Sequence, residues 1–302
     1  MEIGFKTAPQ RVEWATLEAI WARAGELDVF DSAWLYDHFY PVDGDGSCLE
    51  GWTTLAALAH HVPGKRVGHL VLANPYRNPG LLAKMATAMD HVTNGRFILG
   101  LGAGWHMQEA SAFGFEMPPV GARLKDLDAA LTVIRALFDE RAARWPDPAD
   151  GPSSEVGGIS LEAGPYRLWH ARNDPPPLTP GGPPIWLGTQ GERVGLPMAA
   201  RHADGWNYAG RLGGGTAEFV AKRDSLLRRC EALGRDPAGL TISVQLAIGP
   251  LGEDLRPLLD ECLQFAAAGC QHLIIYFDSR GGPAALDRLA REVAAPLKDE
   301  LG

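Results

Sequence analysis

The chain has 302 residues, 46% of them hydrophobic, which is enough to bury a large core and is an ordinary size for one α/β barrel. Its 28 basic residues against 37 acidic ones give a formal net charge of −9, and no basic run stands out, which argues against a nucleic-acid partner. The opening residues, MEIGFKTAPQ, lack the charged-then-apolar pattern of a secretion signal, and no apolar run approaches the ~20 residues that span a membrane.

The cysteines indicate the redox environment. Cys48, Cys230, Cys262 and Cys270 form no C-x-x-C pair and show no framework spacing. We therefore expect four reduced packing residues in a cytoplasmic protein.

Short strand-like runs alternate with helical patterns through the first third of the chain. Strands are predicted over residues 2–6, 32–36 and 66–73, and apolar residues at helical spacing cover 12–27 and 55–62. A further helix begins at Pro79, because the missing N–H of proline costs nothing in a first helical turn.

The fourth strand leads into the segment RFILGLGAGW, residues 96–105. Its apolar run ends in Gly100, Gly102 and Gly104, and backbone without side chains lets a flat or phosphorylated ligand lie against the peptide groups. Such βα junctions are where ligands bind in parallel α/β folds. The dinucleotide fingerprint G-x-G-x-x-G is not met, because its third glycine would fall on Trp105 or Met107. The segment predicts a cofactor pocket that is not a Rossmann site.

The pattern changes after a helix over residues 124–138. Residues 145–183 are rich in Pro, Gly and Asp, with a hairpin-like pair at 159–161 and 166–168, and we interpret them as an insertion over the C-terminal face. Strands then return at 184–188, 205–208, 240–248 and 272–277, with helices at 219–233 and 258–268 between them. Eight βα units in one chain of this length favour a closed (β/α)8 TIM barrel over an open sheet.

Polar residues follow several of these strands. Asp37 and His38 come directly after the second strand, where a histidine exchanges a proton near neutral pH and an adjacent carboxylate orients it. Asn74, in LVLANPYRNPG, offers an amide donor and acceptor at the barrel mouth. GTQGER, residues 188–193, follows the fifth strand and opens a helix whose free N–H groups suit an anion. Taken alone, each motif also fits an ordinary loop or turn.

Two other classes of site are excluded by missing motifs. The sequence has no H-E-x-x-H, and its first strand, IGFKTA, lacks the His-x-His of a metal-dependent hydrolase barrel, so no metal site is predicted. No Gly-x-Ser-x-Gly elbow is present either.

Four motifs in order resemble one family. They are DHF-x-P after the second strand, NPYRNP after the third, GRF-x-LGLGAGW at the fourth, and P-x-W-x-G-x-x-GER…AARHADGWN at the fifth and sixth. Together they resemble the luciferase-like monooxygenase superfamily, and within it the oxidoreductases that use the deazaflavin coenzyme F420. The resemblance covers residues 2–208 and continues more weakly through GCQHLIIYF.

The resemblance implies a role for particular residues. Asp37 and His38 match the pair beside the deazaflavin ring, with His38 handling the proton. The strand end at 70–74, including Asn74, matches the place of a bulged, non-prolyl cis peptide that supports the ring. The residues that match backbone contacts to the cofactor are Gly102, Ala103 and Gly104, and those that match the phosphate-binding turn are Gly188, Thr189 and Gly191.

One position departs from the family pattern. The sugar-phosphate dehydrogenases of the family carry a catalytic carboxylate directly after the glycine cluster, where this chain has Trp105, followed by His106 and Glu109. We therefore expect these three residues to line the pocket of a more apolar small-molecule substrate.

The resemblance also implies an activity. We expect hydride transfer between F420 and a small organic substrate, with ring and substrate held face to face. An FMN-dependent monooxygenase of the same superfamily is the first alternative, and a barrel that binds the cofactor without catalysis is the second. A homodimer is expected from the family.

Overall fold

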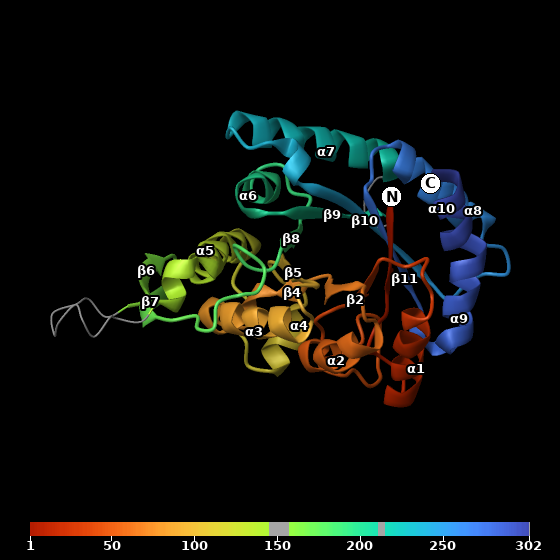
Figure 1. Ribbon diagram of the computed structural model, residues 1–302, viewed down its shortest axis with the longest axis horizontal. Coiled ribbons are helices and arrows are strands. Elements are labelled where there is room, and N and C mark those ends of the chain that lie inside the picture. Colours follow the sequence, from red (N-terminus) through yellow and green to blue (C-terminus); the bar gives the residue numbers. More distant parts are fainter. Residues whose placement is uncertain (145–156, 211–214, 302) are drawn as a thin grey trace.

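The computed structural model of the chain describes residues 1–144, 157–210 and 215–301. Its centre is a closed barrel of parallel strands with helices around it (Figure 1). The barrel closes because β1 (Glu2–Lys6) pairs in parallel with β2 (Ser32–Leu35) on one side and with the last strand, β11 (His272–Phe277), on the other. The predicted (β/α)8 barrel is confirmed.

The remaining strands continue the order around the barrel. Next to β2 lies β3 with β4, followed by β5, β8, β9 and β10, and β10 pairs with β11. Their bounds are β3 (Arg66–His69), β4 (Leu72–Ala73), β5 (Phe97–Gly102), β8 (Ile185–Gly188), β9 (Gly205–Ala209) and β10 (Thr241–Gly249).

At the third barrel position the sequence predicts one strand over residues 66–73. The structure divides it into β3 and β4, with a cis peptide bond between Leu70 and Val71. β3 pairs with β2 and with the start of β5, whereas β4 pairs only with the end of β5. The apolar pattern runs through the break because both halves are buried, so it does not reveal the change of backbone direction.

The outer layer consists of helices. Those between barrel strands are α1 (Trp14–Gly25), α2 (Gly51–Leu58), α3 (Pro79–Val92), α4 (Met107–Ala112), α5 (Val120–Phe138), α6 (Gly195–His202), α7 (Gly215–Ala232) and α8 (Arg256–Ala267), and α9 (Gly282–Leu289) and α10 (Ala295–Leu301) follow β11. α3 begins at Pro79 as predicted, and the Asn78 side chain caps it by accepting from the Gly80 N–H at 2.9 Å. α6 begins at Gly195, four residues beyond the Gly191 of the GTQGER motif.

Large side chains fill the interior of the barrel. They close the barrel beneath the carboxyl ends of its strands. Trp34 and Trp186 meet with ring centroids 5.0 Å apart, packed with Leu70, Ile98 and Ile274. The strands leave room for these rings by using glycine. A Cβ on Gly68 would lie 2.8 Å from the Trp34 ring, and one on Gly205 would lie 2.3 Å from Trp186.

The insertion contains the predicted hairpin, formed by β6 (Ile159–Ala163) and β7 (Tyr166–Ala171), while residues 145–156 lie outside the described ranges. The hairpin lies beside α5 (Figure 1), and the chain after it follows α3, where Asp90 accepts from the Thr179 N–H at 2.7 Å. The described part of the insertion therefore flanks the C-terminal face. It does not cover the cavity, since none of residues 157–183 lines it.

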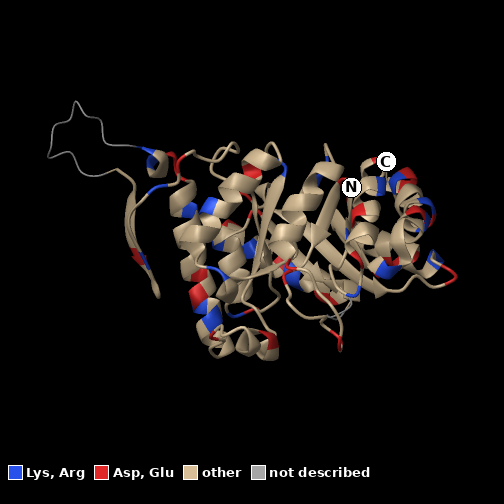
Figure 2. Cartoon of the chain, turned by 90° about the horizontal axis from the view of Figure 1, so that it is seen from below, with Lys and Arg blue, Asp and Glu red and all other residues tan. Residues whose placement is uncertain are grey.

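Charged residues of both signs are interspersed along the outer helices (Figure 2). Within the described residues, no helix combines the length and the apolar character needed to cross a membrane. The four cysteines are all free thiols. Cys230, Cys262 and Cys270 are buried as packing residues, whereas Cys48 is half-buried and donates to the His38 carbonyl, with Sγ and O 3.3 Å apart.

Candidate active site

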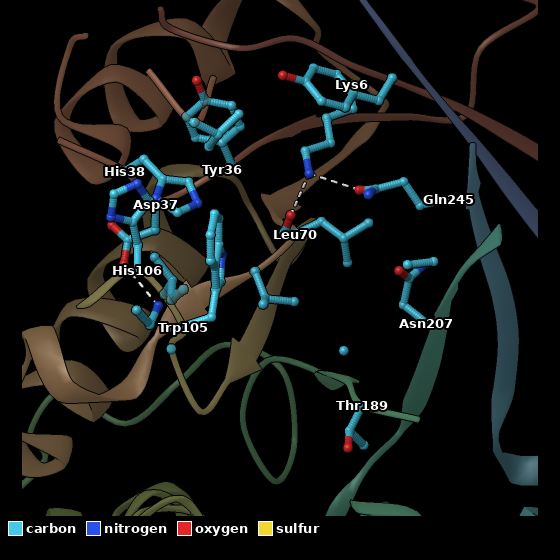
Figure 3. Close-up of a pocket in the computed structure, with 18 of the residues that line it drawn as sticks. Lys6, Tyr36, Asp37, His38, Leu70, Trp105, His106, Thr189, Asn207 and Gln245 are labelled. Atoms are coloured by element: carbon cyan, nitrogen blue, oxygen red, sulfur yellow. Dashed lines mark hydrogen bonds between the residues drawn. The ribbon is translucent and has the colours of Figure 1, made fainter. Parts of the chain in front are cut away.

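A cavity of about 610 Å³ opens at the carboxyl ends of the barrel strands (Figure 3). Every one of the eight strand positions, with the loop after it, contributes to its lining. Representative residues in barrel order are Lys6, Tyr36, Leu72, Gly104, Gly188, Asn207, Gln245 and Tyr276. This is the end at which TIM barrels place their reactive groups.

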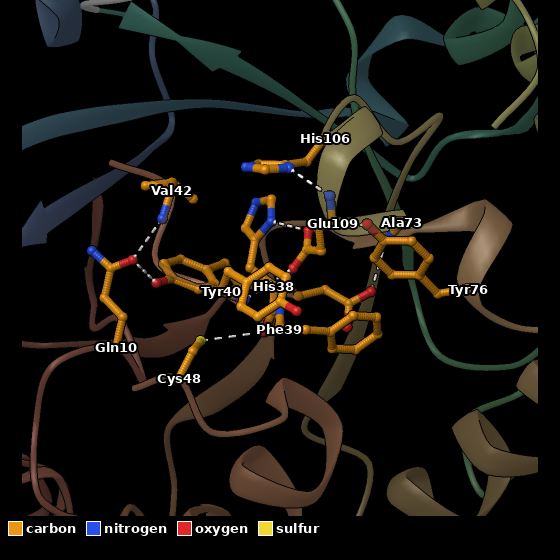
Figure 4. Close-up of polar contacts among 12 residues, drawn as sticks. Gln10, His38, Phe39, Tyr40, Val42, Cys48, Ala73, Tyr76, His106 and Glu109 are labelled. Atoms are coloured by element: carbon orange, nitrogen blue, oxygen red, sulfur yellow. Dashed lines mark hydrogen bonds and ion pairs between the residues drawn. The ribbon is translucent and has the colours of Figure 1, made fainter. Parts of the chain in front are cut away.

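His38 lies in this cavity on the loop after β2, as the sequence predicts. Its Nδ1 is 2.8 Å from Oε2 of Glu109, a residue on α4 (Figure 4). The imidazole ring also meets Trp105 and His106 edge to face, with centroids 5.5 and 5.9 Å away. An ionised carboxylate only accepts hydrogen bonds, so Nδ1 carries the hydrogen and Nε2 is the nitrogen left for proton exchange.

Glu109 is fully buried and saturated with donors. Oε2 accepts from His38 and from the Tyr76 hydroxyl, which is 3.0 Å away, while Oε1 accepts from the backbone N–H groups of Phe39 and Tyr40. Burial alone raises the pKa of this carboxyl, but these hydrogen bonds outweigh it and hold the pKa of Glu109 below its usual range. Glu109 therefore stays ionised and fixes the orientation of His38. The sequence placed Glu109 in the substrate pocket, and the structure places it behind the histidine instead.

Asp37 does not orient His38, as its position next to the histidine in the sequence suggests. Its two carboxylate oxygens accept from the Arg77 guanidinium at 2.7 and 2.9 Å, and Oδ2 also accepts from the Ala73 N–H at 2.9 Å. The Asp37 and Arg77 side chains are 0% and 11% exposed, and Arg77 extends to Glu50, the cap of α2. Asp37 lines the cavity but clamps the loop after β2 to the segment after β4. The carboxylate that orients His38 is Glu109.

Trp105 and His106 form the outer rim of the cavity on the β5 side. Trp105 is 60% exposed, so its ring presents an apolar surface at the entrance. His106 is the cap of α4, since its Nδ1 accepts from the Glu109 N–H at 3.1 Å. This cap fixes the start of the helix that carries Glu109, so His106 supports the His38 pair indirectly.

The glycine cluster serves two purposes. Gly104 lines the cavity with φ at +73°, a left-handed conformation that favours glycine. Gly102 and Ala103 do not line it. A Cβ on Gly102 would lie 2.7 Å from the Val71 side chain, so this glycine accommodates the cis segment between β3 and β4.

Two other predicted cofactor residues lie outside the cavity lining. Asn74 is 3% exposed and turns toward the insertion, where its Nδ2 donates to the Tyr166 hydroxyl at 3.1 Å. Gly191 lies further along the loop than Gly188 and Thr189, both of which do line the cavity. The GTQGER loop reaches the site through its first half.

Sequence reasoning missed the side of the cavity opposite His38. Lys6 at the end of β1 and Gln245 on β10 contact each other there, with Asn207 nearby (Figure 3). Two signals in the sequence could have indicated it. One is a lysine at the end of the strand EIGFK, and the other is the polar Gln245 within the apolar run of β10. Together, the wall of Leu70 and Val71 and the polar groups on both sides fit a flat, partly apolar ring with polar edges.

Comparison with known proteins identifies the family of this chain. Residues 8–263 match the luciferase-like monooxygenase family model, and the chain belongs to that family. A phthiodiolone/phenolphthiodiolone dimycocerosates ketoreductase of Mycobacterium sp. (strain JLS) is 28% identical over 218 residues, which cover 70% of this chain and 51% of the relative. The chain thus spans about half the length of the curated relatives of this kind that it matches.

Two solved structures share the fold. An F420-dependent secondary alcohol dehydrogenase in complex with an F420-acetone adduct aligns with a TM-score of 0.78 at 16% identity, covering 97% of this chain and 98% of that one. A riboflavin lyase with modified FMN and riboflavin aligns with a TM-score of 0.75 at 14% identity, covering 99% and 92%. At these identities the likeness establishes the barrel fold.

Proposed function

We propose that this chain is an oxidoreductase that binds coenzyme F420 at the barrel mouth and interconverts a small alcohol and its carbonyl compound. The observation that carries the proposal is His38, which lines a cavity of a luciferase-like barrel and is bonded from behind by the buried Glu109. When bound, F420 supplies the hydride donor or acceptor, and the protein supplies a positioned proton carrier.

His38 is our candidate proton carrier. Glu109 holds the hydrogen on Nδ1, so Nε2 takes the proton of an alcohol or delivers one to the oxygen of a carbonyl. Because Glu109 is buried and held in its charged form, it also stabilises the imidazolium that appears when Nε2 takes the proton. The apolar rim at Trp105 suits a substrate with a hydrocarbon surface.

The cofactor assignment rests on the shape of the lining. Leu70 and Val71 offer an apolar wall for a ring, and the backbone at Gly104 and Gly188 leaves space beside it. Residues 188–191 are our candidate for holding the phosphate-bearing tail. The names of the relatives point the same way, since a ketoreductase and an F420-dependent secondary alcohol dehydrogenase are among them.

FMN is the alternative cofactor, because a structural neighbour holds modified FMN on the same barrel. Titration of the purified protein with each cofactor, followed by absorbance near 420 nm and in the flavin bands, decides between them. Tighter binding of F420 by tenfold, or ~1.4 kcal/mol, supports the proposal. Tenfold tighter binding of FMN makes an FMN-dependent monooxygenase the better assignment, and a tight complex without turnover of any alcohol or ketone points to a binding protein.

Replacement of His38 tests the catalytic role. A positioned general acid or base contributes ~10²–10⁴ in rate, so His38→Ala should lose about that factor in kcat, with cofactor affinity within threefold of wild type. Glu109→Gln should move the pH profile of kcat, since it alters the histidine without touching substrate. His60→Ala is the matched control, because His60 is an exposed histidine that does not line the cavity. Activity of His38→Ala within threefold of wild type across pH contradicts the proposal.

The homodimer is proposed from the family resemblance alone. Light scattering of the purified chain at two concentrations measures its mass, and a monomer at both would remove this part of the proposal.

A further inference from the structure

Lys6 is a buried lysine on the cavity wall, and among the described residues it has no acidic partner. It is 4% exposed, and its Nζ donates to the Leu70 carbonyl at 2.5 Å and to the Gln245 side-chain oxygen at 2.7 Å. Figure 3 shows the side chain reaching into the cavity between these two acceptors. Both acceptors are neutral, and within the described ranges Lys6 forms no ion pair with a carboxylate.

The groups around Lys6 do not neutralise its charge. The rings of Tyr276 and Tyr36 lie 5.0 and 5.8 Å from Nζ, and burial raises the pKa of both phenols, so they remain uncharged at neutral pH. Among the described residues, the one carboxylate that lines the cavity, Asp37, is already paired with Arg77. An ammonium carries three N–H donors, and the two hydrogen bonds leave one for a ligand.

We infer that Lys6 is a binding site for a ligand oxygen that carries full or developing negative charge. Two neutral acceptors do not require a charged donor, whereas a negative oxygen gains most from one, and more so beside a buried group than in open water. Burial lowers the pKa of Lys6 to about 7, so at neutral pH the binding of such an oxygen draws a proton from solvent onto the amine. The inference deepens the proposed function and rests on it in one respect, since the oxygen belongs either to the cofactor ring or to the substrate.

Lys65 provides a matched control within the same chain. It is 7% exposed, and its Nζ also donates to two neutral carbonyls, those of Leu27 and Phe30, both at 2.8 Å. It does not line the cavity. The two lysines share their low exposure and their bonds to neutral oxygens, whereas Lys65 lies outside the cavity and near the carboxylates of Asp28 and Asp31.

The test follows the protonation of Lys6 by NMR in protein labelled with ¹³C at the lysine ε-carbon. The Lys6 signal is assigned by its loss in Lys6→Met, or in Lys6→Gln should the first variant not fold. Its titration midpoint is measured without ligand, with F420 in each redox state, and with octanoate as a stable anionic oxygen on an apolar chain. We expect at least one probe to raise the midpoint by a pH unit or more, with the Lys65 midpoint unchanged.

A second measurement compares the affinity of the variants for the same probes. Lys6→Met should weaken the effective probe at least tenfold, while Lys65→Met stays within twofold of wild type. A response to F420 alone assigns the oxygen to the cofactor ring, and a response to octanoate alone assigns it to the substrate. The inference is overturned if neither probe moves the Lys6 midpoint, or if Lys6→Met binds both within twofold. Failure of wild type to bind F420 and FMN defeats the proposed function instead, because the octanoate measurement needs no cofactor.

Discussion

Lys6 ties the stability of the barrel to pH in a way that one substitution can isolate. An ordinary lysine has a pKa of about 10.4, whereas burial lowers the pKa of Lys6 in the folded chain to about 7. Between these values the unfolded chain binds one more proton than the folded chain, so the free energy of unfolding rises with pH. Below pH 7 both states are protonated and the folded state carries a buried charge. Above the ordinary value both are neutral and the penalty has gone.

The size of the effect follows from the shift. Each pKa unit corresponds to ~1.4 kcal/mol, so the Lys6 contribution changes by on the order of 4 kcal/mol between neutral pH and about pH 10. Lys6→Met removes the titrating group and keeps most of the length of the side chain. The difference in unfolding free energy, wild type minus Lys6→Met, should therefore grow by that amount across the window in favour of wild type.

Urea unfolding at pH 6, 7, 8, 9 and 10, followed by tryptophan fluorescence, measures this difference. Other groups whose protonation differs between the two states in this window are present in both proteins and cancel, such as Cys48, whose pKa burial raises to about 12 in the folded chain while the unfolded thiol titrates inside the window. Lys125→Met, an exposed lysine on α5, serves as the control and should give a difference that does not depend on pH. A constant difference between wild type and Lys6→Met from pH 7 to 10 would refute the reasoning.

Three further substitutions test other parts of the site. Asp37→Asn breaks a buried ion pair with Arg77 and should cost about 3 kcal/mol in urea unfolding, and a loss below 1 kcal/mol would show that the clamp is dispensable. Gly104→Ala places a Cβ at φ +73° and 3.2 Å from a proline ring, so it should lose about 1–2 kcal/mol, and a variant as stable as wild type would contradict the strain argument. Tyr166→Phe removes the hydroxyl that accepts from Asn74 Nδ2, and the buried Oδ1 of Asn74 already has no hydrogen-bond partner in the described structure. The free energy of unfolding should therefore fall by about 1–2 kcal/mol, with ligand affinity unchanged. Weakened ligand binding in Tyr166→Phe would mean that the insertion shapes the cavity after all.

The barrel was predictable because its signal is repeated. Eight short apolar runs separated by helical periods specify the topology, and small errors in each boundary do not accumulate. The apolar pattern does not show where the backbone changes direction within a buried strand. The division at Leu70 and Val71 depends on packing against the glycines of neighbouring strands, such as Gly102 and Gly188, which belong to distant segments.

The site was predictable where chemistry and position coincide in one residue. His38 ends a strand and carries a group that titrates near neutral pH, so it could be found from the sequence. Lys6 also ends a strand, but a lysine is ordinarily a surface residue and nothing local marks it as buried. Its environment is set by Gln245, which is 239 positions away.

The partner of His38 shows why neighbours in sequence mislead at such a site. Side chains of consecutive residues at the end of a strand point in different directions, so the carboxylate of Asp37 is poorly placed to bond the ring of His38. The carboxylate that orients the His38 ring approaches from another element, since Glu109 lies on α4, 71 positions later. Asp37 is then free to fix the loop itself, through Arg77 and the Ala73 N–H. The two acidic residues therefore have separate structural roles: Asp37 holds the loop in place, and Glu109 orients the His38 ring.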